Sequence, residues 1–172
     1  MAVAALSNSD IQHLTDRFGL HVTIVMYHDI KHHSEDLVNM LPVVILYELN
    51  YPIGHWVAIF QNNQGLQYFD PTGKEPDELL IKHFKNPLGR KKLNADYTYL
   101  LSWMDDNFNE IIYNEIALQP PDTNTCGYWV GVRLVFYELS QEDFANAFSN
   151  FTDDERQKCI VQLFNFLSGL DE

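Results

Sequence analysis

The sequence predicts an α+β fold, in which strands occupy the middle of the chain and helices lie on either side of them. Two short apolar runs, Val43 to Leu49 and His55 to Phe60, predict adjacent strands. Capping signals followed by apolar residues at helical spacing predict helices near both ends. With 172 residues, 46% of them hydrophobic, the chain can bury one substantial core, and we expect a single domain over residues 1–172.

The N-terminal part of the chain predicts a helix followed by a strand. Ser9-Asp10-Ile11-Gln12 resembles a capping box, and apolar residues then follow at helical spacing as far as Phe18. Gly19 can end this helix. The β-branched run from Val22 to Met26 predicts a strand, and the polar segment from Tyr27 to Asn39 predicts a loop.

The centre of the chain predicts a β-hairpin. Side chains alternate along the run that begins at His55. His55 and every second residue after it lie on one face of the strand, and Trp56 and every second residue after it lie on the other. Asn62 to Gly65 is a turn, and Leu66 to Phe69 is the next strand. Because the ends of a hairpin meet, we expect His55 to lie near Asp70.

The second half of the chain predicts mainly helices. We expect a helix over Glu75–Phe84, a segment of slight helical preference over Ala95–Met104 and a strand over Ile111–Leu118. A buried helix over Gly127–Leu139 should begin at the cysteine, and a short helix capped by Ser140 should end near Phe148. A last helix is capped by Thr152 and directs Ile160, Leu163, Phe164 and Leu167 towards the core.

Charge and cysteine content exclude several classes of protein. A formal charge of −13 is poorly suited to binding phosphate backbones. The basic cluster Arg90-Lys91-Lys92 is better explained as a solvated turn than as a docking patch for an acidic partner. Two cysteines, Cys126 and Cys159, form no disulfide framework and suit a reducing compartment. The longest apolar stretch, Met40 to Leu49, is too short to span a bilayer and is interrupted by Pro42.

Four residues supply the parts of a cysteine hydrolase: a thiol, an imidazole, a carboxylate and an amide. Cys126 stands where a polar loop becomes a helix, and a helix N-terminus favours the thiolate. His55 would accept its proton, Asp70 would orient the imidazole, and Gln119 would donate to the developing oxyanion.

Each of the four also has an ordinary structural explanation. Cys126 could be a buried core cysteine, and His55 a strand histidine with a satisfied hydrogen bond. Asp70 begins an Asp-Pro-x-Gly turn, and Gln119 could be a polar strand end. Together, however, these explanations require four coincidences in a fixed order, which favours the catalytic interpretation.

The order of these residues resembles the adenovirus-protease-like (adenain-like) cysteine proteases, and the chain is also similar to the related proteases specific for SUMO and other ubiquitin-like proteins. The resemblance spans roughly positions 8 to 135, and residues 7–11 also look like the start of the homologous enzymes of virophages and Polinton-type elements. The matching segments are Gly54-His55-Trp56-Val57-Ala58, Tyr68-Phe69-Asp70-Pro71-Thr72-Gly73, Gln119 and Thr125-Cys126-Gly127.

This resemblance implies a papain-like or adenain-like fold, with a central mixed sheet between helices. It implies a triad of Cys126, His55 and Asp70, with Gln119 in the oxyanion hole. It suggests cleavage after small residues, in Gly-Gly or Gly-X-Gly sequences. The leading hypothesis is a viral maturation protease that cleaves capsid or other virion precursor proteins, found in the host cytoplasm and the virion. The alternative is an enzyme that processes or deconjugates a ubiquitin-like modifier.

Cofactors and substrate contacts follow from the same comparison. Adenovirus protease uses a viral peptide and DNA, but the acidic charge here argues against DNA. An activating peptide is a possible partner, and no bound cofactor or metal is expected. Trp56, with Gly54 and Gly127, would wall a narrow substrate groove, although core packing is the safer explanation for Trp56. Cys159, at helical spacing with Ile160, is expected to pack in the core.

Three further interpretations stay open at this point. A similar arrangement of histidine, acid and cysteine serves acetyl transfer in some bacterial effectors. A degenerate, protease-derived binding protein is the non-enzymatic alternative. His28, His32 and His33 with Asp29 could suggest a metal site, but their loop context favours a solvated surface.

Overall fold

The computed structural model describes residues 3–33, 36–50, 53–83 and 99–170. A five-stranded sheet in the order β1-β2-β3-β4-β5 forms its centre. The β1/β2 and β4/β5 pairs are parallel, whereas β2/β3 and β3/β4 are antiparallel, so the sheet is mixed, as expected. The strands are β1 (Thr23–Met26), β2 (Val43–Asn50), β3 (Ile53–Asn62), β4 (Gly65–Phe69) and β5 (Ile111–Tyr113).

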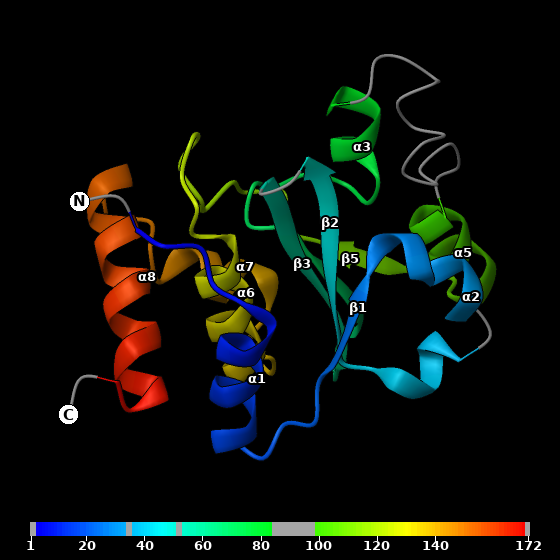
Figure 1. Cartoon of the computed structure of the whole chain (residues 1–172), viewed down its shortest axis with the longest axis horizontal. Coiled ribbons are helices and arrows are strands. Elements are labelled where there is room, and N and C mark those ends of the chain that lie inside the picture. Colours follow the sequence, from blue (N-terminus) through cyan, green and yellow to red (C-terminus); the bar gives the residue numbers. More distant parts are fainter. Residues whose placement is uncertain (1–2, 34–35, 51–52, 84–98, 171–172) are drawn as a thin grey trace.

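Helices cover both faces of the sheet (Figure 1). The helices α1, α6 and α8 pack together, and α6 lies directly on β3. On the opposite face, α3 contacts β2, and α2 contacts α5. The helices on the first side are α1 (Asn8–Arg17), α6 (Cys126–Val135), α7 (Gln141–Asn146) and α8 (Asp153–Ser168), and those on the second are α2 (Ile30–His33), α3 (Glu78–His83) and α5 (Tyr99–Asn107).

The alternation of side chains along β3 divides the apolar interior into two cores. Trp56 and Ala58 belong to the core shared with α1, α6 and α8, whereas Val57 and Ile59 belong to the core on the other face. The predicted faces of this strand are therefore confirmed. The predicted hairpin is also confirmed, since β3 pairs with β4 through Ala58 and Phe69.

The cap of the first helix lies two residues before the predicted one. Ser7, not Ser9, is the N-cap: its side chain accepts from the main-chain N–H of Asp10, and the Asp10 carboxylate accepts from the main-chain N–H of Ser7 at 2.8 Å. Both serines precede an acidic or amide residue by three positions, so the sequence pattern alone does not separate them. Gly19 follows the helix with φ +69°, as the expected C-terminal glycine.

The helices of the C-terminal part are capped as predicted. Ser140 accepts from the N–H of Asp143 before α7, and Thr152 forms a capping box with Glu155 before α8. The nucleophile candidate is the first residue of α6, but this helix ends at Val135, four residues earlier than predicted. The buried guanidinium of Arg133 explains that ending, because it donates to the carbonyl oxygens of Phe136 (2.6 Å) and Leu139 (2.8 Å).

Other boundaries differ from the prediction. The segment expected as a loop contains the 3₁₀ turns η1 (Tyr27–Asp29) and η2 (Leu37–Met40) and the short α2. The reason is that Tyr27, Ile30 and Leu37 are buried in the core on this face of the sheet. The helix α3 begins at Glu78 rather than Glu75, since Asp77 before it has φ +63°. The basic cluster at residues 90–92 lies outside the described residues. No helix in the described ranges is long and apolar enough to cross a bilayer.

The capping of α1 yields a test with an internal control. Replacing Ser7 by Ala removes the N-cap acceptor and should lower the free energy of unfolding by about 1 kcal/mol. Ser9→Ala lies inside the helix and should change it by less than about 0.5 kcal/mol. Urea unfolding of both variants measures the difference, and a larger loss for Ser9→Ala would place the cap at Ser9 instead.

Candidate active site

The hairpin brings His55 and Asp70 into direct contact. The Nε2 atom of His55 lies 2.8 Å from Oδ1 of Asp70, and the two residues are only 6% and 1% exposed. Because a carboxylate accepts, the imidazole donates its Nε2–H to Asp70. This hydrogen bond leaves Nδ1 as the ring nitrogen available to another partner.

The Asp70 carboxylate is held by the turn that it begins. Its Oδ1 atom also accepts from the main-chain N–H and from the hydroxyl of Thr72, both at 2.7 Å. The N–H of Gly73 donates to the carbonyl oxygen of Asp70 at 2.8 Å, which closes the turn. With three donors on one oxygen, the carboxylate is fixed in the direction of the imidazole.

The charge state of His55 reflects competing influences. Burial of the ring lowers its pKa, but the charge of Asp70 and their hydrogen bond raise it, and hydrogen bonding and charge from Cys126 raise it further, to about 9. Asp70 and Cys126 therefore both lie close enough to the imidazole of His55 to raise its pKa. An imidazole that is held by a carboxylate can carry a proton next to a neighbouring thiol.

Cys126 lies at the N-terminus of α6 with 7% of its surface exposed. The residue before it, Thr125, makes no side-chain capping bond to the helix in the described part of the chain; its hydroxyl lies 3.2 Å from that of Thr123. The first N–H groups of the helix are therefore not covered by a capping side chain, and their partial positive charge lies at the thiol.

Gln119 is attached to the loop that leads into Cys126. Its Nε2 donates to the carbonyl oxygen of Thr123 at 2.7 Å, and its side chain is 8% exposed in total. Because only the NH₂ end of the amide can face a carbonyl oxygen, this bond fixes which end points to the loop. The second N–H of the same nitrogen is left to donate elsewhere, while Oε1 is buried with no partner among the described residues.

The two halves of the site are joined through the turn after β4. The carbonyl oxygen of Pro71 accepts from the N–H groups of both Leu118 and Gln119, each at 2.8 Å. Gly73 has φ +69°, and an added Cβ there would lie 2.8 Å from the nitrogen of Ala117, so only glycine fits this contact. The segment that carries Gln119 thus lies directly on the turn that carries Asp70.

Of the three residues expected to contact substrate, Gly127 follows Cys126 in α6, and Trp56 packs in the core with 5% of its surface exposed. An added Cβ at Gly127 would be 3.2 Å from Cδ1 of Trp56 and 3.0 Å from Cβ of Leu6. The N–H of the Trp56 indole also donates to the carbonyl oxygen of Leu6 at 3.3 Å. Gly54, in contrast, lies in the β2/β3 pair, where an added Cβ would meet the Leu46 side chain at 2.7 Å.

Sequence reasoning did not identify four residues of this region: Leu6, Thr72, Asn114 and Thr123. Thr72 could have been found, since an Asp followed two residues later by a donor is the signature of an Asx turn. Leu6 and Asn114 contact the site only through the tertiary fold, whereas Thr123 lies in the same loop as Gln119. No periodic pattern in the sequence marks any of the three.

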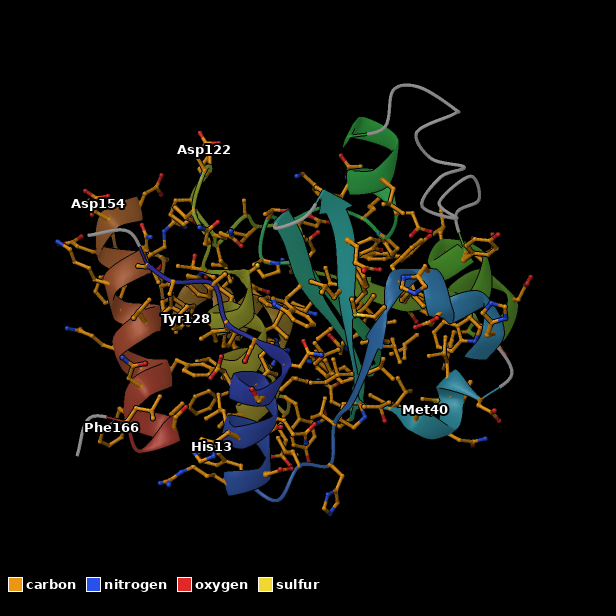
Figure 2. All side chains as sticks on the ribbon, in the orientation of Figure 1. His13, Met40, Asp122, Tyr128, Asp154 and Phe166 are labelled. Carbon is orange, nitrogen blue, oxygen red and sulfur yellow. The ribbon has the colours of Figure 1, made fainter. Side chains whose placement is uncertain are left out.

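The remaining candidates lie apart from this site. His28 contacts the carboxylates of Glu48 and Asp29, so it is paired rather than simply solvated, while His32 is exposed. Cys159 is half-buried and packs against the core formed with α8, as predicted, and both cysteines are free thiols. Figure 2 shows Asp122 at the tip of the loop before Cys126, pointing away from the fold.

The likeness of this chain to known proteins is structural. No protein-family model and no curated protein sequence matches this chain. Among solved structures, it is similar to ChlaDub1 from Chlamydia trachomatis, with 15% sequence identity and a TM-score of 0.40, covering 96% of this chain and 80% of that chain. The function proposed for this chain therefore rests on the residues of the site.

The charge state of His55 predicts how stability depends on pH. Its pKa in the folded protein is raised to about 9, so its stabilising contribution is complete below about pH 6.5 and is lost as the pH rises through about 9. The wild type should lose roughly 3 kcal/mol at most across this window. Asp70→Asn removes the charge responsible and should show a flatter dependence.

Urea unfolding at several pH values would measure this difference. Parallel pH profiles for the wild type and Asp70→Asn would contradict an electrostatic interaction between His55 and Asp70 in the folded protein. A flatter profile for the variant would support it.

Proposed function

We propose that this chain is a cysteine peptidase that cleaves protein substrates, with Cys126 as the nucleophile. The observation that carries this proposal is the position of His55: its Nε2 is bonded to Asp70, and it lies close enough to Cys126, at the start of α6, for the thiol to raise its pKa. An imidazole oriented by a carboxylate and presented to a thiol is the arrangement that activates a sulfur nucleophile.

In the proposed reaction, the proton of the thiol resides on Nδ1 of His55. The Cys126 sulfur attacks the carbonyl carbon, and the C–N bond breaks as Nδ1 gives its proton to the leaving amine. A thioester then links the substrate acyl group to Cys126. Water attacks this thioester, His55 takes a proton from that water, and the sulfur leaves as the restored thiolate. Asp70 keeps the ring oriented throughout and stabilises its charged form.

Two groups are placed to stabilise the oxyanion. The main-chain N–H of Cys126 belongs to the first turn of α6, where N–H groups have no acceptor within the helix. Gln119 can contribute the N–H that it does not donate to Thr123. Donors aimed at the developing charge in a site this buried act in a low dielectric, where they are most effective.

The substrate that this site favours is an extended chain with small side chains. Trp56 and Leu6 pack against Gly127, the residue after Cys126, and an aromatic side chain beside glycine would exclude bulky substrate side chains. Two substrate classes present such sequences: a ubiquitin-like modifier with a C-terminal glycine tail, and a virion precursor protein with Gly-X sites. We favour the modifier, because a free, flexible tail can enter a narrow site more easily than an internal loop.

The first test needs no substrate. Iodoacetamide labelling of the purified protein between about pH 5 and about pH 9 should modify Cys126 rapidly at the acid end, since thiolate is the reactive form. Cys159 in the same molecule serves as the reference thiol. His55→Ala should slow labelling of Cys126. His13→Ala should not, because His13 lies on α1 and its ring contacts the carbonyl oxygen of Ser168, the last residue of α8. Equal labelling of the two cysteines would contradict an activated nucleophile.

A second test separates the substrate classes. We expect the protein to release a fluorescent amine from the C-terminal glycine of at least one ubiquitin-like modifier, and Cys126→Ala to abolish release while it still folds. A parallel panel of internal Gly-X-Gly peptides represents the precursor class. Turnover of the internal peptides alone would favour the precursor class, and turnover that survives in Cys126→Ala would remove the proposed nucleophile.

A further inference from the structure

Asn114 lies at the point where β5 ends beside the turn that carries Asp70. The parallel strands β4 and β5 pair through Tyr68 and Tyr113, so the residue after Tyr113 lies next to the end of β4. Asn114 is 4% exposed and takes no part in the reaction proposed above. A buried amide at such a position needs polar partners.

Those partners are the main-chain groups of Asp70 itself. Oδ1 of Asn114 accepts from the N–H of Asp70 at 2.8 Å, and Nδ2 donates to the carbonyl oxygen of Asp70 at 2.5 Å. The side-chain amide thus offers the donor and the acceptor that a neighbouring strand would offer. It continues the pairing of the sheet by one residue after β5 has ended.

The same side chain also holds the segment that leads to Gln119. Its Nδ2 lies 3.4 Å from the carbonyl oxygen of Ile116, two residues along the chain. Beyond Ile116, the N–H groups of Leu118 and Gln119 are bonded to Pro71. Asn114 therefore lies at the beginning of the contact between the two chain segments that supply Asp70 and Gln119.

We infer that Asn114 is a positioning residue of this site, which holds the Asp70 main chain so that its carboxylate meets Nε2 of His55. This inference rests on the proposed peptidase function. Asn114 touches neither the thiol nor the imidazole in the described contacts, so it acts through Asp70. A small displacement of Asp70 would be enough, because misplacement by about 1 Å can cost a catalytic group two orders of magnitude in rate.

Asn114→Ala and Asn114→Asp test the inference in complementary ways. The first removes the amide; the second keeps its shape and its acceptor but replaces the donor to the carbonyl oxygen of Asp70 with another acceptor. Asn62→Ala is the matched control, since Asn62 also uses its side-chain amide to hold main-chain groups, those of Tyr137 and Gln64, at the other end of β3.

The measurement is the rate of Cys126 labelling by iodoacetamide against pH, together with thermal unfolding of each variant. A stability role alone would lower the unfolding temperature and leave the labelling profile of the folded protein unchanged, which is the result expected for Asn62→Ala. For both Asn114 variants we expect labelling at the acid end to fall about tenfold or more, with cooperative unfolding retained.

The outcomes separate this inference from the proposed function. A wild-type profile in folded Asn114 variants would overturn the positioning role and leave the peptidase proposal intact. If Cys126 of the wild type reacts like Cys159 at every pH, the peptidase proposal fails, and the inference fails with it. Loss of folding in both Asn114 variants would make Asn114 a residue of general stability and would also overturn the inference.

Discussion

The site depends on one close contact, between the turn Asp70–Gly73 and the segment Ile116–Gln119. The carbonyl oxygen of Pro71 receives two N–H groups from that segment, and Gly73 has no side chain because the nitrogen of Ala117 occupies the place of its Cβ. The packing of α6 on β3 already joins the helix of Cys126 to the strand of His55, and this contact adds the segment that carries Gln119. A glycine with positive φ is the simplest solution to such a close approach.

Burial of polar groups is the energetic cost of building the site in this way. His55, Asp70, Asn114 and Gln119 are all less than a tenth exposed, and each would be unfavourable there without hydrogen-bond partners. The bonds among them and to the main chain offset that cost, but apolar residues of similar size could pack as well. A buried polar network that adds little net stability is retained more readily for the geometry that it fixes.

The sequence predicted the local parts of this arrangement better than the long-range ones. Alternation along His55–Phe60 and the turn at Asn62–Gly65 were sufficient to place His55 by Asp70, because a hairpin is a local structure. The strand predicted over Ile111–Leu118 ends instead at Tyr113. Its apolar residues continue beyond that point, but their hydrogen bonds go to Pro71 and to the Asn114 side chain, and neither partner can be recognised without the tertiary fold.

The burial of the reacting groups also restricts how a substrate can reach them. The exposed fractions of Cys126, His55 and Gln119 are 7%, 6% and 8%, so in the proposed peptidase little of each residue would be open to a scissile bond. A helix or a strand within a sheet has its main-chain groups already bonded and cannot reach them. An extended segment with small side chains can, since its carbonyl groups are free to accept. For the proposed peptidase, burial would therefore restrict the conformation of the substrate chain first and the size of its side chains second, and a flexible glycine tail satisfies both conditions.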